Sequence, residues 1–174
     1  MSKKRAPKPT SYSRVTLARI MSANDANLLG NVHGGVIMKA VDNTAGACAA
    51  RHCRGPAVTA AIDGMVFVEP VRVGDILTTR AQVNWVGRTS VEVGVQVTAQ
   101  RWDDAGSADH HVASAYLVFV AIDADEQPVE VPELIVETDE DRRRWHEAEI
   151  RRDHRLAQRR EIKAARAAAK PTGS

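Results

Sequence analysis

One long helical pattern followed by four strand-like segments limits the folds that this chain can adopt. Residues 36–51 carry apolar side chains at intervals of three and four, which is typical of an amphipathic helix. The strand-like segments alternate or run apolar between breaks that contain Gly, Pro or Asp, at residues 58–68, 76–85, 91–100 and 112–122. Residues 15–21 alternate weakly and predict one earlier strand. Because only one long helix can cover this antiparallel sheet, we expect an α+β domain whose sheet wraps around the helix.

The start of that helix is the most informative stretch of the chain. Gly34 and Gly35 allow a sharp turn, and the first N–H groups of a helix have no partner within it. Such groups and the helix dipole attract developing negative charge. The apolar stripe of the helix comprises Val36, Ile37, Ala40, Val41, Thr44 and Cys48. Asp42 falls off this stripe among small and apolar residues, which is unusual for a solvated carboxylate.

These residues suit attack on a carbonyl group. The Gly34 and Gly35 N–H groups can hold the carbonyl oxygen as it gains charge, and Asp42 can act as a base or a nucleophile. The Asn31 amide can orient a water molecule or the substrate. His33 could do the same, although a packing role is the stronger interpretation. Asp63 is a second possible carboxylate, and a structural hydrogen-bonding role accounts for it equally well.

Other kinds of site are absent from the sequence. The chain has no nucleophile elbow, P-loop, dinucleotide fingerprint or H-E-x-x-H zinc motif. Its six histidines are scattered, and His110-His111 is a weak candidate for metal binding. We therefore predict no metal site and no cofactor.

The charge distribution separates a core from two basic ends. Four basic and no acidic residues occur in residues 1–10, and eleven basic against seven acidic residues occur in 138–174. Since the net charge is +2, the segment between them carries −6. An acidic core argues against nucleic-acid binding. We predict a flexible basic arm over 1–13, a folded domain over 14–132 and a charged helical tail over 133–174, docked at most by Trp145 and Ile150.

The cysteines and the absence of targeting segments in the sequence predict the cellular compartment. Cys48 and Cys53 fit neither a disulfide framework nor a metal-binding spacing, which favours free thiols in a reducing compartment. The basic N-terminus has no apolar segment of a signal peptide after it. The longest apolar run, residues 116–122, is too short to cross a bilayer. We expect a soluble cytoplasmic protein without membrane insertion.

The segment Asn31-Val32-His33-Gly34-Gly35, with Asp42 seven residues later, resembles the hotdog-fold acyl-CoA thioesterases, in particular the cytosolic brain acyl-CoA hydrolase branch. The resemblance covers about residues 14–155. Further similar pieces are Arg51-His52-Cys53, Phe67-x-x-Pro70, Val73-Gly74-Asp75, Ser90-Val91-Glu92-Val93 and the charged helix after Val131-Pro132. Each piece is weak alone, and their combination is specific.

The resemblance implies a hotdog fold in which the paired Asn and Asp, here Asn31 and Asp42, come from different subunits. It also implies a dimer, assembled further into a hexamer as a trimer of dimers. Vertebrate members of the branch carry two such domains in one chain, whereas here one domain holds both residues. Arg88, Thr89 and Ser90 lie where the family binds the phosphates of coenzyme A, and an ordinary hairpin turn explains them equally well.

The sequence therefore predicts a metal-independent thioesterase that hydrolyses fatty acyl-CoA at a site shared across a dimer interface. Two alternatives stay open at this point. An acyl-thioester dehydratase or isomerase of the same fold would need a His–acid pair that includes His33. A non-catalytic acyl-CoA sensor would not need both Asn31 and Asp42.

Overall fold

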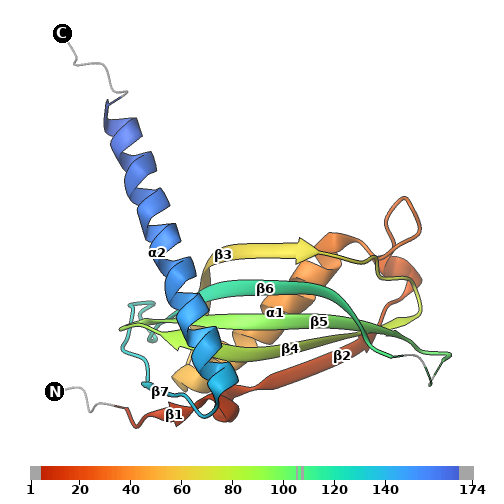
Figure 1. The fold of residues 1–174 in the computed structure, drawn as a ribbon, viewed down its shortest axis with the longest axis horizontal. Helices are drawn as coiled ribbons and strands as arrows, with labels where there is room; N and C mark the ends of the chain where they lie inside the picture. Colours follow the sequence, from red (N-terminus) through yellow and green to blue (C-terminus); the bar gives the residue numbers. More distant parts are fainter. Residues whose placement is uncertain (1–4, 105, 107, 169–174) are drawn as a thin grey trace.

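The computed structural model describes residues 5–104, 106 and 108–168. It contains two long helices and a large sheet, with short elements near the N-terminus and before the second helix (Figure 1). The helices are α1 (Gly34–Cys53) and α2 (Asp139–Ala168), and short 3-10 turns, η1 and η2, occupy Thr10–Ser13 and Ala23–Asp25. The strands are β1 (Lys8–Pro9), β2 (Val15–Ile20), β3 (Ala57–Phe67), β4 (Asp75–Val86), β5 (Ser90–Arg101), β6 (His110–Ala121) and β7 (Leu134–Ile135).

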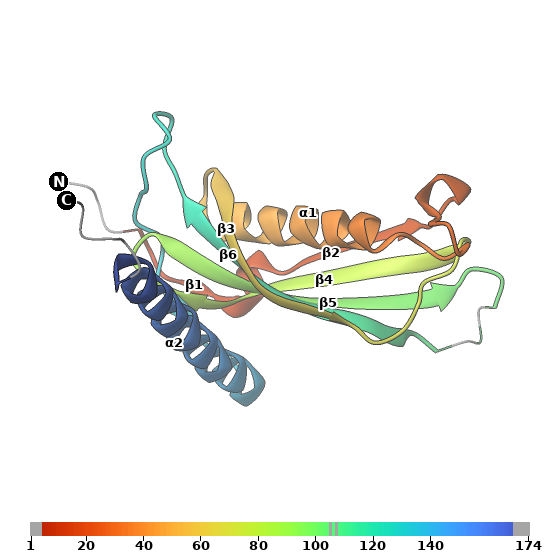
Figure 2. The same ribbon diagram turned by 90° about the horizontal axis from the view of Figure 1, so that it is seen from above.

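The main sheet has five strands in the order β2-β4-β5-β6-β3, and all neighbours are antiparallel. It curves around α1, which lies along one face, while α2 crosses the opposite face (Figure 2). The predicted architecture, an antiparallel sheet wrapped around one long helix with a second helix at the C-terminus, is confirmed. The predicted strand ends agree with the observed ones to within two residues.

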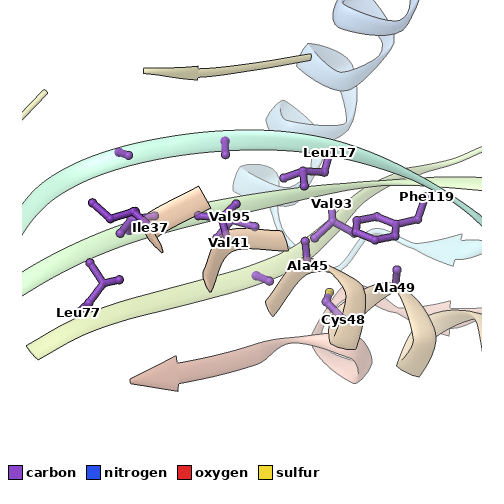
Figure 3. Close-up of a cluster of buried hydrophobic side chains, with 14 of the residues drawn as sticks. Ile37, Val41, Ala45, Cys48, Ala49, Leu77, Val93, Val95, Leu117 and Phe119 are labelled. Atoms are coloured by element: carbon purple, nitrogen blue, oxygen red, sulfur yellow. The ribbon is translucent and has the colours of Figure 1, made fainter. Parts of the chain in front are cut away.

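The core lies between α1 and the concave face of the sheet (Figure 3). On β5, alternate residues are all buried: Val91, Val93, Val95, Val97 and Ala99. The buried face of α1 is wider than the predicted stripe, because Ala45 and Ala49 are fully buried as well. Their small side chains allow the helix to approach the sheet closely.

The outer face of the sheet is partly covered by α2. Glu92 of β5 is only 2% exposed, and Arg151 of α2 forms an ion pair with it at 2.7 Å. The Arg151 guanidinium also lies 3.7 Å from the centre of the Tyr116 ring. Trp145 packs against Trp85, with ring centres 6.2 Å apart.

The prediction that only Trp145 and Ile150 would dock this helix is therefore wrong. Ile150 is 46% exposed, and buried polar contacts fix the helix in its place. Sequence periodicity underestimates such docking because it counts apolar residues and not charged pairs.

The predicted flexible arm over residues 1–13 is wrong for residues 8–13; residues 1–4 lie outside the described part. Strand β1 pairs in parallel with β7, and Thr10 is buried. The Lys8 ammonium donates to the carbonyl oxygen of His52 at the end of α1. Thr10 also donates to Asp141 of α2. Residues 8–13 therefore connect the end of α1 to the start of α2, and belong to the folded domain.

One edge of the sheet, β3, presents apolar side chains to solvent. Val58, Ile62 and Val66 are 47%, 49% and 67% exposed, respectively. Within the described residues, no helix is both long and apolar enough to cross a membrane. An exposed apolar edge strand is a surface on which a second sheet can pair.

Candidate active site

A tight turn before α1 fixes the position of Asn31. The Asn27 N–H donates to the Asn31 carbonyl oxygen at 2.7 Å, and the Asn27 side-chain oxygen accepts from the Asn31 N–H at 3.2 Å. Gly30 has a φ of +81°, a value that a residue with a side chain rarely adopts. Asn31 also forms an isolated bridge with Arg72. The backbone of Asn31 is thus held from both sides, with its side chain at the start of α1.

The first turn of α1 begins earlier than the sequence predicts, because His33 caps it. The His33 Nδ1 accepts a hydrogen bond from the Gly35 N–H at 2.9 Å. The Gly35 N–H is therefore occupied. Among the described residues, no partner for the Gly34 N–H is found, so this group is free to bind an oxygen atom. His33 is exposed and caps α1 instead of packing in the core, and its Nδ1 faces a backbone amide rather than an acid.

Asp42 lies two turns further along α1 and is half-buried. Its Oδ1 accepts a hydrogen bond of 2.7 Å from the Oγ1 of Thr59 on β3. Thr59 could not be predicted from the sequence, because it is 17 residues from Asp42 and no motif links the two positions. Only the packing of β3 beside α1 brings the hydroxyl and the carboxylate together.

Asn31 and Asp42 of one chain lie at different levels of α1. Eight residues of helix separate Gly34 from Asp42, which corresponds to about 12 Å along the axis.

Arg88 and Thr89 lie in the connection from β4 to β5, and Ser90 is the first residue of β5, at the other end of α1. The Thr89 carbonyl oxygen accepts from the Ala121 N–H, and the next N–H, of Ile122, donates to Pro56 just beyond α1. This end of the domain is on the left in Figure 1, while α1 begins on the right. The exposed Arg88 side chain is therefore remote from Asn31 of its own chain.

The remaining chemical candidates have structural roles. Asp63 pairs with Arg155 of α2, on the face of the sheet opposite α1. Cys48 and Cys53 are free and buried, and burial raises the pKa of their thiols to about 12 and about 11, respectively. Within the part of the chain that the structure describes, no cluster of three His, Cys, Asp or Glu side chains could hold a metal ion.

Comparison with known proteins identifies the family. Residues 29–101, which include Asn31, Asp42 and Thr59, match the family model described as the thioesterase superfamily. The acyl-CoA hydrolase of Staphylococcus aureus is 32% identical, superimposes with a TM-score of 0.83, and the match covers 91% of this chain and 95% of that one. This chain belongs to the thioesterase superfamily.

Two further members of the thioesterase superfamily are similar to it. The cytosolic acyl coenzyme A thioester hydrolase of Rattus norvegicus is 34% identical over 145 residues, which are 83% of this chain. The match spans only 38% of the rat protein. An apo hexameric acyl-CoA thioesterase is 30% identical with a TM-score of 0.84, over 88% of this chain and 97% of that one.

The Staphylococcus aureus member of the superfamily has been crystallised with butyryl coenzyme A, coenzyme A and coenzyme A disulfide. It has also been crystallised with single alanine substitutions of an asparagine, an aspartate and a threonine. Asn31, Asp42 and Thr59 are of the same three residue types. The sequence pointed to Asn31 and Asp42, whereas Thr59 was found only in the structure.

Proposed function

We propose that this protein is an acyl-CoA thioesterase that hydrolyses fatty acyl-CoA to a free fatty acid and coenzyme A. The observation that carries the proposal is the Asp42 carboxylate, which is half-buried on α1 and oriented by the Thr59 hydroxyl. The names of the rat and Staphylococcus aureus relatives support the same substrate class.

The proposed site combines the start of α1 from one subunit with the middle of α1 from another. The axial offset of about 12 Å between Gly34 and Asp42 supports this arrangement, because Asn31 precedes Gly34 in the same chain. The exposed apolar edge strand β3, on which Thr59 lies, offers a surface for pairing with the same strand of a second copy. A two-fold axis there would give each dimer two equivalent Asn31–Asp42 sites. The hexameric relative supports further assembly of such dimers into a trimer of dimers.

The reaction can be written with groups of this chain alone. The thioester carbonyl oxygen accepts a hydrogen bond from the Gly34 N–H, which stabilises the negative charge that develops on this oxygen. Asp42 removes a proton from a water molecule, whose oxygen attacks the carbonyl carbon, and the Asn31 amide orients the reacting groups. The C–S bond then breaks, and the proton passes to the departing sulfur. Direct attack by the Asp42 carboxylate is the covalent variant of the same chemistry.

The coenzyme A portion would extend along the outside of the domain towards Arg88, Thr89 and Ser90, where the guanidinium can pair with a phosphate. No metal or cofactor is needed, because hydrolysis transfers no electrons and the carboxylate and backbone amide supply the base and the anion stabilisation. The name of the rat relative supports a cytoplasmic location.

Release of free thiol from purified protein and a panel of acyl-CoAs, followed with a thiol reagent, tests the activity. Asp42→Asn keeps the shape of the side chain but removes its charge. We expect kcat to fall by about 10²-fold or more, with an unchanged melting temperature. Asn31→Ala should inactivate the enzyme as well.

Mixing the two inactive variants tests the shared site. After unfolding and refolding together, random pairing restores about one quarter of the intact Asn31–Asp42 sites, so activity should reappear. Wild-type protein taken through the same treatment is the control for recovery. A mixture as inactive as its parents, beside a recovered wild type, would contradict a site built from two subunits.

A further inference from the structure

Two leucines at the tip of the turn before α1 are almost fully exposed. Leu28 is 105% and Leu29 is 86% exposed, more than any other large apolar side chain among the described residues. Both lie within three residues of Asn31. Isolated apolar residues are common on protein surfaces, but two adjacent leucines without contacts beside a candidate catalytic residue call for an explanation.

This turn is too constrained for the leucines to fold back onto the domain. The Asn27 side-chain oxygen accepts from the Leu29 N–H at 2.8 Å, and the Gly30 N–H donates to the Asn27 carbonyl oxygen at 3.0 Å. Together with the two hydrogen bonds between Asn27 and Asn31, these contacts close the turn on itself. The backbone of the turn therefore presents both side chains outward, at a fixed position relative to Asn31.

The surface next to this turn is also apolar. A hollow of about 370 Å³ lies between the start of α1 and the end of β3, and both Asn31 and Gly34 line it. Ile37, Phe67 and Val68 supply apolar walls. The Phe67 ring lies against Gly34, 3.6 Å from the position that a Cβ atom would take there. Asn31 and Gly34, which suit a thioester, therefore have apolar surface on two sides: the walls of this hollow and the two leucines of the turn.

We propose that Leu28 and Leu29 contact the hydrocarbon chain of the acyl group and determine the preference for long over short acyl chains. This inference rests on the proposed function, which brings the thioester to Asn31 and Gly34. An acyl thioester joins a polar carbonyl to an apolar chain. At this end of α1, the polar groups of Asn31 and Gly34 likewise lie next to the apolar side chains of Leu28 and Leu29. Because the backbone of the turn is already fixed, the two leucines can contact the chain with little further loss of backbone freedom.

Steady-state kinetics with butyryl-CoA and dodecanoyl-CoA test the proposal. In Leu28→Gln/Leu29→Gln, we expect kcat/KM for butyryl-CoA to stay within about twofold of wild type. For dodecanoyl-CoA it should fall about tenfold, which corresponds to roughly two methylene groups leaving an apolar contact. Ile162→Gln is the matched control, because Ile162 is 45% exposed on α2, away from this turn. Its kinetics should match wild type for both substrates.

Two outcomes would overturn the proposal. An equal loss for both substrates would mean that the leucines only hold the turn in place. A smaller oligomer by analytical ultracentrifugation would mean that they contact a neighbouring subunit instead.

A binding measurement separates this proposal from the proposed function. In the Asp42→Asn background, calorimetry compares the affinities for dodecanoyl-CoA and free coenzyme A with and without the two leucine substitutions. We expect the substitutions to weaken dodecanoyl-CoA binding about tenfold and to leave coenzyme A binding unchanged. Unaltered binding of both overturns the role of the leucines, whereas failure of wild-type protein to release thiol from any acyl-CoA overturns the function.

Discussion

The Oγ1 of Thr59 donates a hydrogen bond to the Oδ1 of Asp42 at 2.7 Å, which joins strand β3 to the middle of α1. The bond restricts the orientation of the carboxylate and leaves its second oxygen available. Because β3 is an edge strand of the sheet, any assembly at this edge places a second subunit near the same carboxylate.

Removal of the Thr59 hydroxyl should therefore slow the reaction without unfolding the protein. Without this bond the Asp42 carboxylate is no longer held in one orientation, so Thr59→Val should lower kcat by about tenfold or more. Thr59→Ser, which keeps the hydroxyl, should stay close to wild type. Thiol-release kinetics and melting curves of both variants check this. Equal kcat values for the two variants would show that the hydroxyl does not position Asp42.

Arg88→Ala should raise KM for acyl-CoA and change kcat little, because a phosphate contact far from the carbonyl is the same in the ground and transition states. Arg160→Ala on the exposed half of α2 is a matched control for the loss of one positive charge. If KM does not change, Arg88 belongs to an ordinary hairpin turn and the coenzyme A assignment is wrong.

The Arg151–Glu92 pair predicts a stability effect. Arg151→Ala leaves the Glu92 carboxylate, which is 2% exposed, without its cationic partner, and should lower the free energy of unfolding by about 3 kcal/mol. Arg152, with a more exposed side chain, pairs with Asp153 at 3.4 Å. Arg152→Ala should therefore cost less than about 1 kcal/mol. Urea denaturation of both variants measures the difference, and similar midpoints would show that the buried pair contributes little.

Two truncations should divide α2 into a docked and an undocked part. The side chains of residues 157–168 are all exposed, so removal of residues 157–174 should leave the melting temperature unchanged. Removal of residues 139–174 also takes away buried Asp141, buried Ala148 and the partner of Glu92, and should lower the melting temperature clearly. Scanning calorimetry of the two shortened proteins tests this. A sharp drop for the shorter deletion would mean that the exposed half of α2 supports the assembly.

His52 predicts a pH dependence of stability. Burial lowers the pKa of this fully buried side chain below its ordinary value of 6.5, while a contact of 3.0 Å between Nε2 and the Pro132 carbonyl oxygen opposes the shift. The unfolded chain therefore takes up a proton at a higher pH than the folded one. The contribution of His52 is fully present above about pH 6.5 and declines as the pH falls towards the lower folded pKa.

His52→Gln retains a donor for the Pro132 carbonyl oxygen but cannot titrate. Its melting temperature should fall less between pH 7 and pH 5 than that of wild type. Parallel curves for the two proteins would assign the acid sensitivity to other groups.

The sequence by itself determined the order and type of the main elements and two of the three side chains of the candidate site. Periodicities of 3.6 and 2 report which residues one face of a helix or strand buries, so α1 and the strands β2 to β6 could be predicted closely. Asn31 and Asp42 could be found because they stand in a compact motif around the start of one helix.

Only the tertiary structure decided the contacts between residues far apart in the chain. Thr59 meets Asp42, Arg151 meets Glu92, and residues 8–13 connect α1 to α2, because packing brings these elements together. Hydrogen bonds and ion pairs depend on distance and direction in space, and residue spacing along a chain does not record either of them. The Gly35 N–H is the local example, since the orientation of the His33 ring decides that this N–H is already occupied.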